Sequence, residues 1–293
     1  MKRLLSFLLL IALAGLLAAR TRHGYVPVSG GARLYYEERG TGEPLILLHG
    51  HSLDTRMWDF QFRVFARRYR VVSFDFRGYG RSSAQTEGFQ FTHLDDMLTL
   101  MDSLHIRRAH IVGLSMGAFI AGDMLGIAPE RMLSCVLASG GPKKQPGPSE
   151  PMDSAEWARR DREITELRAK GVETMKKEWL EGLISSGGSN RESMRRPLRR
   201  MISRWTAWQP LHHEARVLYG NDAVRLIRSC HPAVPTLVLE GGAPGNRHSG
   251  RSWLSDVMPD VWVQELPDCG HMMNMEQPDA FNRAVLEFLN RLP

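Results

Sequence analysis

The chain has 293 residues and a formal net charge of +6, and it is 43% hydrophobic and 24% charged. This is enough chain for one large α/β domain with an insertion, or for two small domains, and the composition is that of an ordinary globular protein. The positive charge alone would suit a nucleic-acid-binding protein. No binding motif and no interleaving of basic with aromatic residues accompanies it, so we expect no nucleic-acid partner.

The N-terminal segment has the pattern of a targeting signal. Lys2 and Arg3 precede an uncharged apolar run over Leu4–Ala19, which is long for a secretion signal and short for a spanning helix. We therefore predict an exported protein that is periplasmic, secreted or anchored, with membrane association through residues 1–19 as an option. Cleavage as a signal peptide and retention as an N-terminal anchor both stay open, and residues 1–22 are excluded from the fold.

From residue 23 onward, short apolar runs alternate with amphipathic segments. We expect two strands within Gly24–Gly40, joined at Gly30-Gly31, and further strands at Pro44–Leu48, Val71–Phe74, Ala109–Val112, Leu133–Ala138, Pro235–Leu239 and Val261–Leu266. We expect helices at Thr55–Arg68, Thr92–Ile106, Ala118–Leu125, near Arg251–Val257 and at Glu276–Leu292. Strands that alternate with helices across short loops indicate an α/β fold, here a mostly parallel eight-stranded sheet with helices on both faces.

The alternation stops after Pro142 and resumes only at Pro235. The stretch between them is polar and has helical patterning without strand-like runs. We interpret residues 143–230 as a helical cap inserted after the sixth strand. The α/β core would then consist of residues 23–142 and 231–293.

Most of the excess positive charge lies in this expected cap. From Lys143 to Arg204 the chain holds fifteen Lys/Arg and ten Asp/Glu, a net charge of +5. We interpret these charges as a solvated helical face. A lid that steers anionic substrates and a surface that contacts an anionic membrane are the alternatives.

The cysteines give no sign of a metal centre. Cys135, Cys230 and Cys269 have spacings that indicate neither a disulfide framework nor a metal site, so we expect no metal. Cys135 lies in an apolar run and is expected to be a buried small hydrophobic residue.

The candidate chemistry begins at Gly113-Leu-Ser115-Met-Gly117, between an expected strand and an expected helix. G-x-S-x-G in that setting is a nucleophile elbow, a turn so sharp that Gly113 and Gly117 are required where a Cβ would clash. The Ser115 Oγ would stand at the tip of the turn. The start of the following helix offers free N–H groups and a positive dipole end to a developing oxyanion.

Two further loops supply the other catalytic groups. His271 follows an expected strand and precedes the last helix, which is the place of the general base in the chain order Ser, acid, His. It would take the proton of Ser115 and pass it to the leaving group. The backbone N–H groups of His51 and Met116 are expected to form the oxyanion hole, whereas the side chain of His49 is expected to hydrogen-bond within its own loop.

At this point the chain resembles the α/β-hydrolase family, from Gly24 to Leu292. The matching pieces are His49-Gly50, Asp75-x-Arg77-Gly78-x-Gly80-x-Ser82, Gly113-x-Ser115-x-Gly117, the strand Pro235–Gly241, and Gly270-His271 followed by Glu276-x-Pro278. The run HSLDTRMWDFQ and the later segment Arg107–His110 resemble the branch of enol-lactonases and small-ester hydrolases. The resemblance implies a helical cap between the sixth and seventh strands and hydrolysis without a cofactor. A serine nucleophile argues against the aspartate-using haloalkane dehalogenases and epoxide hydrolases.

The triad acid departs from the family pattern. The family places an Asp a few residues after the strand Pro235–Gly241, but this chain has Pro244 there, and the alternative position after Ala138 has the sequence Ser-Gly-Gly. Glu240, at the end of the strand, is the nearest carboxylate, and Asn246 is a neutral second choice. Either the triad has an unusual third member, or Ser and His work as a dyad, or strong catalysis has been lost.

We therefore predict an exported serine hydrolase that cleaves small-molecule carboxylic esters or lactones through a Ser-His acyl-enzyme mechanism, without a cofactor. Its catalytic residues would be Ser115, His271 and Glu240. The alternative is a non-catalytic ligand-binding homologue that has lost its triad acid. Labelling by a fluorophosphonate separates the two, because only an activated serine reacts.

Overall fold

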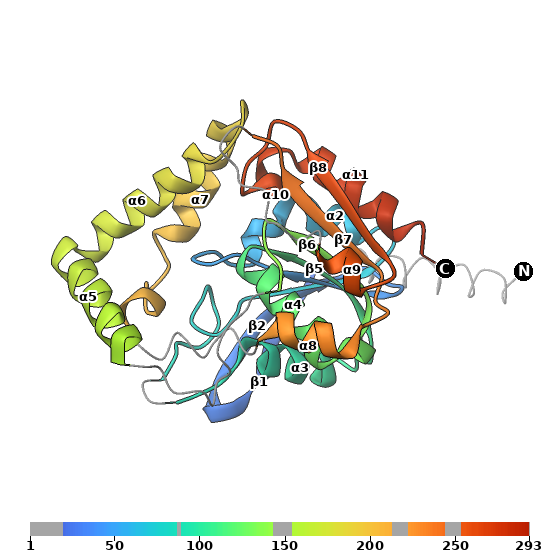
Figure 1. The fold of residues 1–293 in the computed structure, drawn as a ribbon, viewed down its shortest axis with the longest axis horizontal. Coiled ribbons are helices and arrows are strands. Elements are labelled where there is room, and N and C mark those ends of the chain that lie inside the picture. Colours follow the sequence, from blue (N-terminus) through green and yellow to red (C-terminus); the bar gives the residue numbers. More distant parts are fainter. Residues whose placement is uncertain (1–19, 87–88, 143–153, 213–221, 244–252, 293) are drawn as a thin grey trace, which may run out of the picture.

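The computed structural model describes residues 20–86, 89–142, 154–212, 222–243 and 253–292. Its centre is an eight-stranded sheet of order β1-β2-β4-β3-β5-β6-β7-β8 (Figure 1). The strands are β1 (Arg22–Pro27), β2 (Arg33–Arg39), β3 (Pro44–Leu48), β4 (Arg70–Phe74), β5 (Ala109–Leu114), β6 (Met132–Ala138), β7 (Thr236–Gly241) and β8 (Val261–Leu266). β2 pairs antiparallel with β1 and β4, and the remaining pairs are parallel. The predicted mostly parallel eight-stranded sheet is confirmed.

Helices cover both faces of this sheet, also as predicted. The core helices are α2 (Asp59–Phe65), α3 (His93–Ser103), α4 (Met116–Ile127), α8 (Ala223–Cys230), α9 (Leu254–Val257), α10 (Met273–Glu276) and α11 (Pro278–Leu289). Successive strand side chains point to opposite faces. In β3, Leu45 and Leu47 therefore join one apolar core with α2 and α11, whereas Ile46 and Leu48 join the other core with α3 and α4.

Two predicted helices differ from expectation, and in each case one residue explains the difference. The segment expected as one helix from Thr55 starts as a short 3-10 turn, η2 (Thr55–Trp58), because Asp54 accepts a hydrogen bond from the Arg56 N–H (3.0 Å) and fixes its start. The C-terminal helix is divided into α10 and α11, because Pro278 cannot donate an N–H and begins the second helix.

The cap consists of α5 (Ser154–Lys170), α6 (Val172–Ser185) and α7 (Arg195–Ile202), with the short turns η4 (Arg191–Met194) and η5 (Gln209–Leu211). In Figure 1 these helices stand at one side of the sheet.

The last helix of the predicted cap, α8, instead packs against α4 and belongs to the core. Its Ile227 is buried in the core cluster that includes α4. Gly126 of α4 makes room for it, since a Cβ there would lie 2.8 Å from the Cβ of Leu226.

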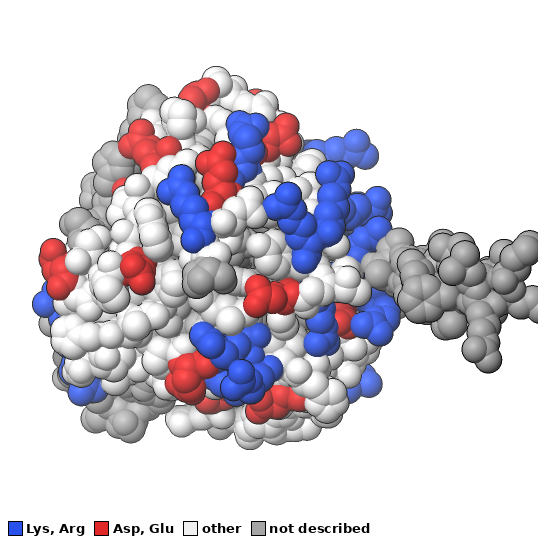
Figure 2. All heavy atoms as spheres, turned by 90° about the vertical axis from the view of Figure 1, so that its right-hand side faces the viewer, with Lys and Arg blue, Asp and Glu red and all other residues white. Residues whose placement is uncertain are grey.

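Much of the cap surface carries mixed, paired charges, in line with the interpretation of a solvated helical face. Lys176 pairs with Glu173 (3.0 Å), and Arg195 pairs with Glu192 (2.7 Å) and with Glu181. Basic and acidic side chains are also interspersed on the opposite side of the molecule, which faces away from the cap (Figure 2). The charges are therefore spread over these surfaces instead of forming one basic band.

The predicted localisation requires correction. Among the helices that the structure describes, none is long and apolar enough to cross a membrane. The apolar run 4–19 on which the prediction rested lies outside the described residues. We therefore withdraw the prediction of an exported, periplasmic, secreted or anchored protein.

Candidate active site

A strained backbone turn joins β5 to α4 at Ser115. The φ and ψ angles of this residue are 56° and −114°, a region that residues with a side chain rarely adopt, and its N–H donates to the Ala138 carbonyl (2.9 Å). Neither neighbouring glycine has room for a side chain. A Cβ on Gly113 would overlap the carbonyl of Gly117, and a Cβ on Gly117 would overlap the carbonyl of Leu48. The turn therefore has the geometry of a nucleophile elbow, with Ser115 half-buried at its tip.

The loop after β3 is held by the buried side chain of His49. The Nε2 atom accepts a hydrogen bond from the Phe76 N–H (3.0 Å), so the proton lies on Nδ1, which donates to the Gly50 carbonyl (2.8 Å). Burial lowers the pKa of His49 to about 4, which keeps the ring neutral at pH 7. His49 thus has the loop-holding role that the sequence predicted.

The same loop brings His51 next to the elbow. A Cβ added to Gly50 would lie 3.6 Å from the Ser115 Cβ, in ordinary van der Waals contact. The Nδ1 atom of His51 lies 2.8 Å from the Tyr79 hydroxyl, which in turn lies 3.4 Å from the Met116 Sδ. Tyr79 therefore connects the two residues whose backbone N–H groups were predicted to form the oxyanion hole, and Met116 is the first residue of α4, where an N–H has no partner within the helix.

The loop that carries His271 is tied to the cap through two carboxylates. Glu276 is fully buried and accepts hydrogen bonds from the N–H groups of Gly270 (2.8 Å) and of Gly188 in the cap (2.6 Å). Asp268 accepts from the N–H of Ser189 (2.9 Å) and from its hydroxyl. Glu276 and Asp268 therefore have a structural role, because they join the loop that carries His271 to the cap.

Glu240 is the next-to-last residue of β7 and lies in register with Glu265 of β8. Leu239 belongs to the apolar core under α11, and Val238 belongs to the core on the opposite face. Strand alternation places Glu240 on the Val238 side of the sheet. Asn246 lies outside the described residues. Glu240 therefore stays a prediction for the triad acid.

A model of the alpha/beta hydrolase family matches residues 45–284. The chain belongs to the alpha/beta hydrolase family. It is 28% identical over 265 residues to a putative non-heme bromoperoxidase, BpoC, of Mycobacterium tuberculosis, covering 87% of this chain and 97% of that protein. It is 26% identical over 271 residues to a pimeloyl-[acyl-carrier protein] methyl ester esterase of Nitrosospira multiformis, covering 88% and 99% of the two chains.

The fold is also that of solved hydrolases. The enol-lactonase from Burkholderia xenovorans LB400 superposes with a TM-score of 0.70 at 22% identity, over 91% of this chain and 100% of that one. This similarity concerns the fold. The family match and the curated relatives support a hydrolase.

Cap side chains that the sequence did not single out cover the loop that carries His51. The Trp179 Nε1–H donates to the Ser52 hydroxyl (2.7 Å), and its ring centroid lies 5.8 Å from that of His51. The Trp205 ring is closer, with a centroid distance of 4.7 Å and an interplanar angle of 79°. The sequence could have indicated these contacts, because tryptophans in an otherwise polar helical segment tend to pack their large apolar rings against another part of the protein.

The acidic residue at the end of β4 is structural in this hydrolase. Asp75 is fully buried and accepts hydrogen bonds from the N–H groups of Thr55 (2.7 Å) and Arg81 (2.8 Å). Burial, assisted by the nearby charge of Asp54, raises the pKa of Asp75 to about 6.

Within the described ranges, no group of three or more His, Cys, Asp or Glu side chains could hold a metal ion. All three cysteines of the hydrolase are free. Cys135 and Cys269 are buried, and burial raises the pKa of both thiols, that of Cys269 to about 12. Cys230 at the end of α8 is exposed.

Proposed function

We propose that the protein is a serine hydrolase that cleaves carboxylic esters or lactones, with Ser115 as the nucleophile and His271 as the general base. The observation that carries this proposal is the strained elbow at Ser115, packed against the loop that holds His51. Strain of this kind persists only where the surrounding structure enforces it. The esterase named among the curated relatives matches nearly the whole of its length, which favours ester chemistry.

In the proposed reaction the Ser115 Oγ attacks the carbonyl carbon of the substrate, and its proton passes to His271. The negative charge on the carbonyl oxygen is held by the backbone N–H groups of His51 and Met116. The bond to the leaving alkoxide breaks as His271 returns the proton to it, which leaves an acyl-Ser115 ester. Water, deprotonated by His271, then attacks this ester and releases the acid and free Ser115.

The neutral side chain of His51 supports the backbone around it. Burial, together with the neighbouring His49, lowers the pKa of His51 to about 4. The ring is therefore uncharged at pH 7 and can share a hydrogen bond with Tyr79. We propose that this bond and the Trp205 contact keep the His51 N–H directed toward the substrate oxygen.

The third member of the triad is proposed as Glu240, with Asn246 as a neutral alternative and a Ser115–His271 dyad as the remaining arrangement. A carboxylate on the Nδ1 side of the base fixes its tautomer and stabilises the imidazolium. A chain without such a partner would retain the ligand-binding pocket and lose most of its turnover.

The test is fluorophosphonate labelling together with hydrolysis of p-nitrophenyl esters of graded chain length. We expect the wild-type chain to be labelled and to turn over short esters. Ser115→Ala should lose both activities while its melting temperature is retained, and the control Ser193→Ala, at an exposed cap position, should behave as wild type. An unlabelled wild-type chain would favour the non-catalytic homologue, and Ser115→Ala with most of its turnover would refute the mechanism.

A further inference from the structure

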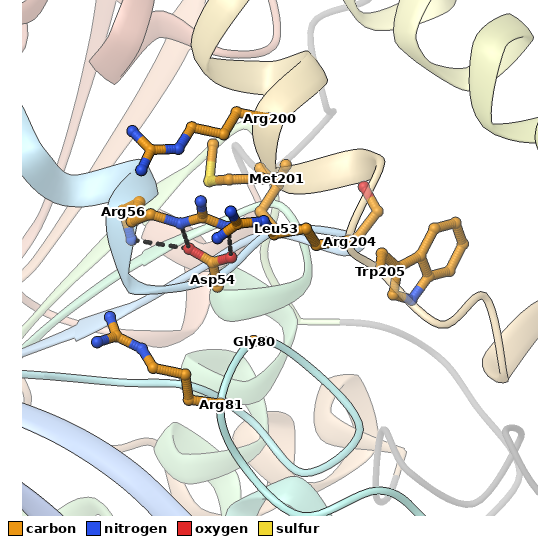
Figure 3. A pocket seen from close by; sticks show the side chains of 10 residues that line it. Leu53, Asp54, Arg56, Gly80, Arg81, Arg200, Met201, Arg204 and Trp205 are labelled. Atoms are coloured by element: carbon orange, nitrogen blue, oxygen red, sulfur yellow. Dashed lines mark hydrogen bonds and ion pairs between the residues drawn. The ribbon is translucent and has the colours of Figure 1, made fainter.

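A cavity of about 340 Å³ lies beside the loop that carries His51 and Ser52, and it is lined by four arginines. Arg56 lies in η2 and Arg81 lies in the loop after β4. Arg200 and Arg204 come from the end of α7 and the turn after it. Figure 3 shows Arg200 and Arg204 reaching from the cap toward the loop that carries Arg56, with Arg81 on the other side of that loop. Asp54 is the one acidic residue in the lining.

Two of these arginines are already paired. The Arg56 guanidinium makes two hydrogen bonds to the Asp54 carboxylate, of 2.8 and 2.5 Å. Burial alone would raise the pKa of Asp54, but the hydrogen bonds and charge of Arg56 outweigh it and hold the pKa below its ordinary value. The Arg81 guanidinium donates to Glu37 (2.9 Å).

The other two arginines have no hydrogen-bonded partner among the described residues, although the charge of Arg200 acts on the nearby Asp59. Arg200 and Arg204 make no ion pair and no side-chain hydrogen bond to any residue that the structure describes. The cavity lining thus holds four guanidinium groups and one carboxylate, that of Asp54. Glu37 and Asp75, which lie outside the lining, offset part of the charge of Arg81, and the remaining charge of the lining is positive. A concave site with this excess positive charge attracts and holds an anion.

The lining also has an apolar part. Leu53, Met201 and Trp205 border the cavity, and all three are buried in the fold. The volume is within the range of sites for small ligands, which is more than a single inorganic ion occupies. Guanidinium groups bind planar carboxylates and phosphates through paired N–H donors.

We propose that this cavity is a binding site for a small organic oxyanion, a carboxylate or a phosphate carried on an apolar or aromatic group. The charged end lies between Arg200 and Arg204, and the apolar end lies against Met201 and Trp205. Neither Ser115 nor His271 lines the cavity, so the site is separate from the reacting groups of the proposed function.

The experiment is isothermal titration calorimetry at low salt on Ser115→Ala, so that turnover plays no part. The probes are phenyl phosphate and benzoate, which distinguish the two oxyanions, and benzyl alcohol, which has the ring without the charge. We expect at least one anion to bind, the alcohol not to bind, and the affinity to fall as salt is added. The double variant Arg200→Gln/Arg204→Gln should bind at least tenfold more weakly, because charge-assisted hydrogen bonds are lost.

The matched control is Arg196→Gln/Arg199→Gln, which also removes two charges, from exposed positions of α7 outside the cavity lining. It should retain the wild-type affinity. Arg200 and Arg204 are exposed, so the double variant should keep its melting temperature. The proposal is overturned if neither anion binds, if benzyl alcohol binds as well as the anions, or if the double variant and the control lose the same affinity. Fluorophosphonate labelling of wild type would be unaffected by each of these outcomes, so the serine mechanism is tested separately.

Discussion

The hydrogen bonds of Glu276 make a quantitative prediction about how the cap is joined to the His271 loop. The carboxylate accepts one N–H from Gly188 and one from Gly270, and its side chain is fully buried. In Glu276→Gln one acceptor oxygen becomes an NH₂ group. One backbone N–H then faces a donor where it had an acceptor.

The expected loss in the free energy of unfolding of Glu276→Gln has two contributions. A hydrogen bond to a charged acceptor is worth about 1.5–3 kcal/mol, and leaving a buried N–H without a partner costs about 1–3 kcal/mol. Their sum puts the loss in the free energy of unfolding at roughly 2.5–6 kcal/mol. Because Gly270 precedes His271, we also expect kcat for a short ester to fall, by up to about 10²-fold if the base is displaced by ~1 Å.

Urea denaturation followed by circular dichroism measures the stability change, and p-nitrophenyl acetate hydrolysis measures kcat. The control is Glu287→Gln, an exposed glutamate in α11 that loses the same charge, and its stability should stay within about 0.5 kcal/mol of wild type. If Glu276→Gln is as stable as Glu287→Gln, the hydrogen bonds of Glu276 between the cap and the His271 loop do not stabilise the fold as inferred.

Three further predictions concern the elbow, the triad acid and a buried histidine. Gly117→Ala should destabilise the fold by about 3 kcal/mol or prevent folding, because its Cβ would overlap the Leu48 backbone, whereas Gly182→Ala in α6 has open space and should gain ~0.5–1 kcal/mol in urea denaturation. Glu240→Gln should lower turnover by several orders of magnitude if Glu240 orients His271; a change within about tenfold, ~1.4 kcal/mol of barrier, would rule it out. The pKa of His51 is lowered to about 4, so below pH 6.5 the unfolded chain takes up a proton that the folded chain does not, and stability falls as the pH drops from 6.5 to 4. This histidine accounts for roughly 3 kcal/mol of that fall in stability. His51→Gln should therefore lose correspondingly less stability over the same pH range. Asp75, whose pKa is raised to about 6, has the opposite effect on stability, but it is present in both chains and cancels in the comparison. Equal slopes in the two chains would refute the assignment.

Features of the fold that are determined by residues close together in the sequence were predictable. The expected strands Pro44–Leu48 and Val261–Leu266 coincide with β3 and β8 residue for residue. The elbow was recognisable because the requirement for Gly113 and Gly117 arises from backbone atoms close by. Each of these features leaves its mark within a short stretch of chain.

Contacts between distant segments were not predictable in the same way. The hydrogen bond from Gly188 to Glu276 joins residues that are 88 positions apart, and no periodicity or motif marks it. The same holds for Arg200 and Arg204, which the sequence suggested were part of a solvated face and which lie together with Arg56 and Arg81 around one cavity. The residue types were visible in advance, but their common location depends on how the cap sits on the core.

The cysteines of this protein have a practical consequence for studying it in solution. Of the three thiols, Cys135 and Cys269 are buried and resist ionisation, whereas Cys230 is exposed at the end of a core helix. A maleimide in solution can therefore reach one of the three thiols in the folded chain, that of Cys230. A fluorophore, spin label or surface linker can be attached to the unaltered sequence at Cys230, on α8 and outside the cap.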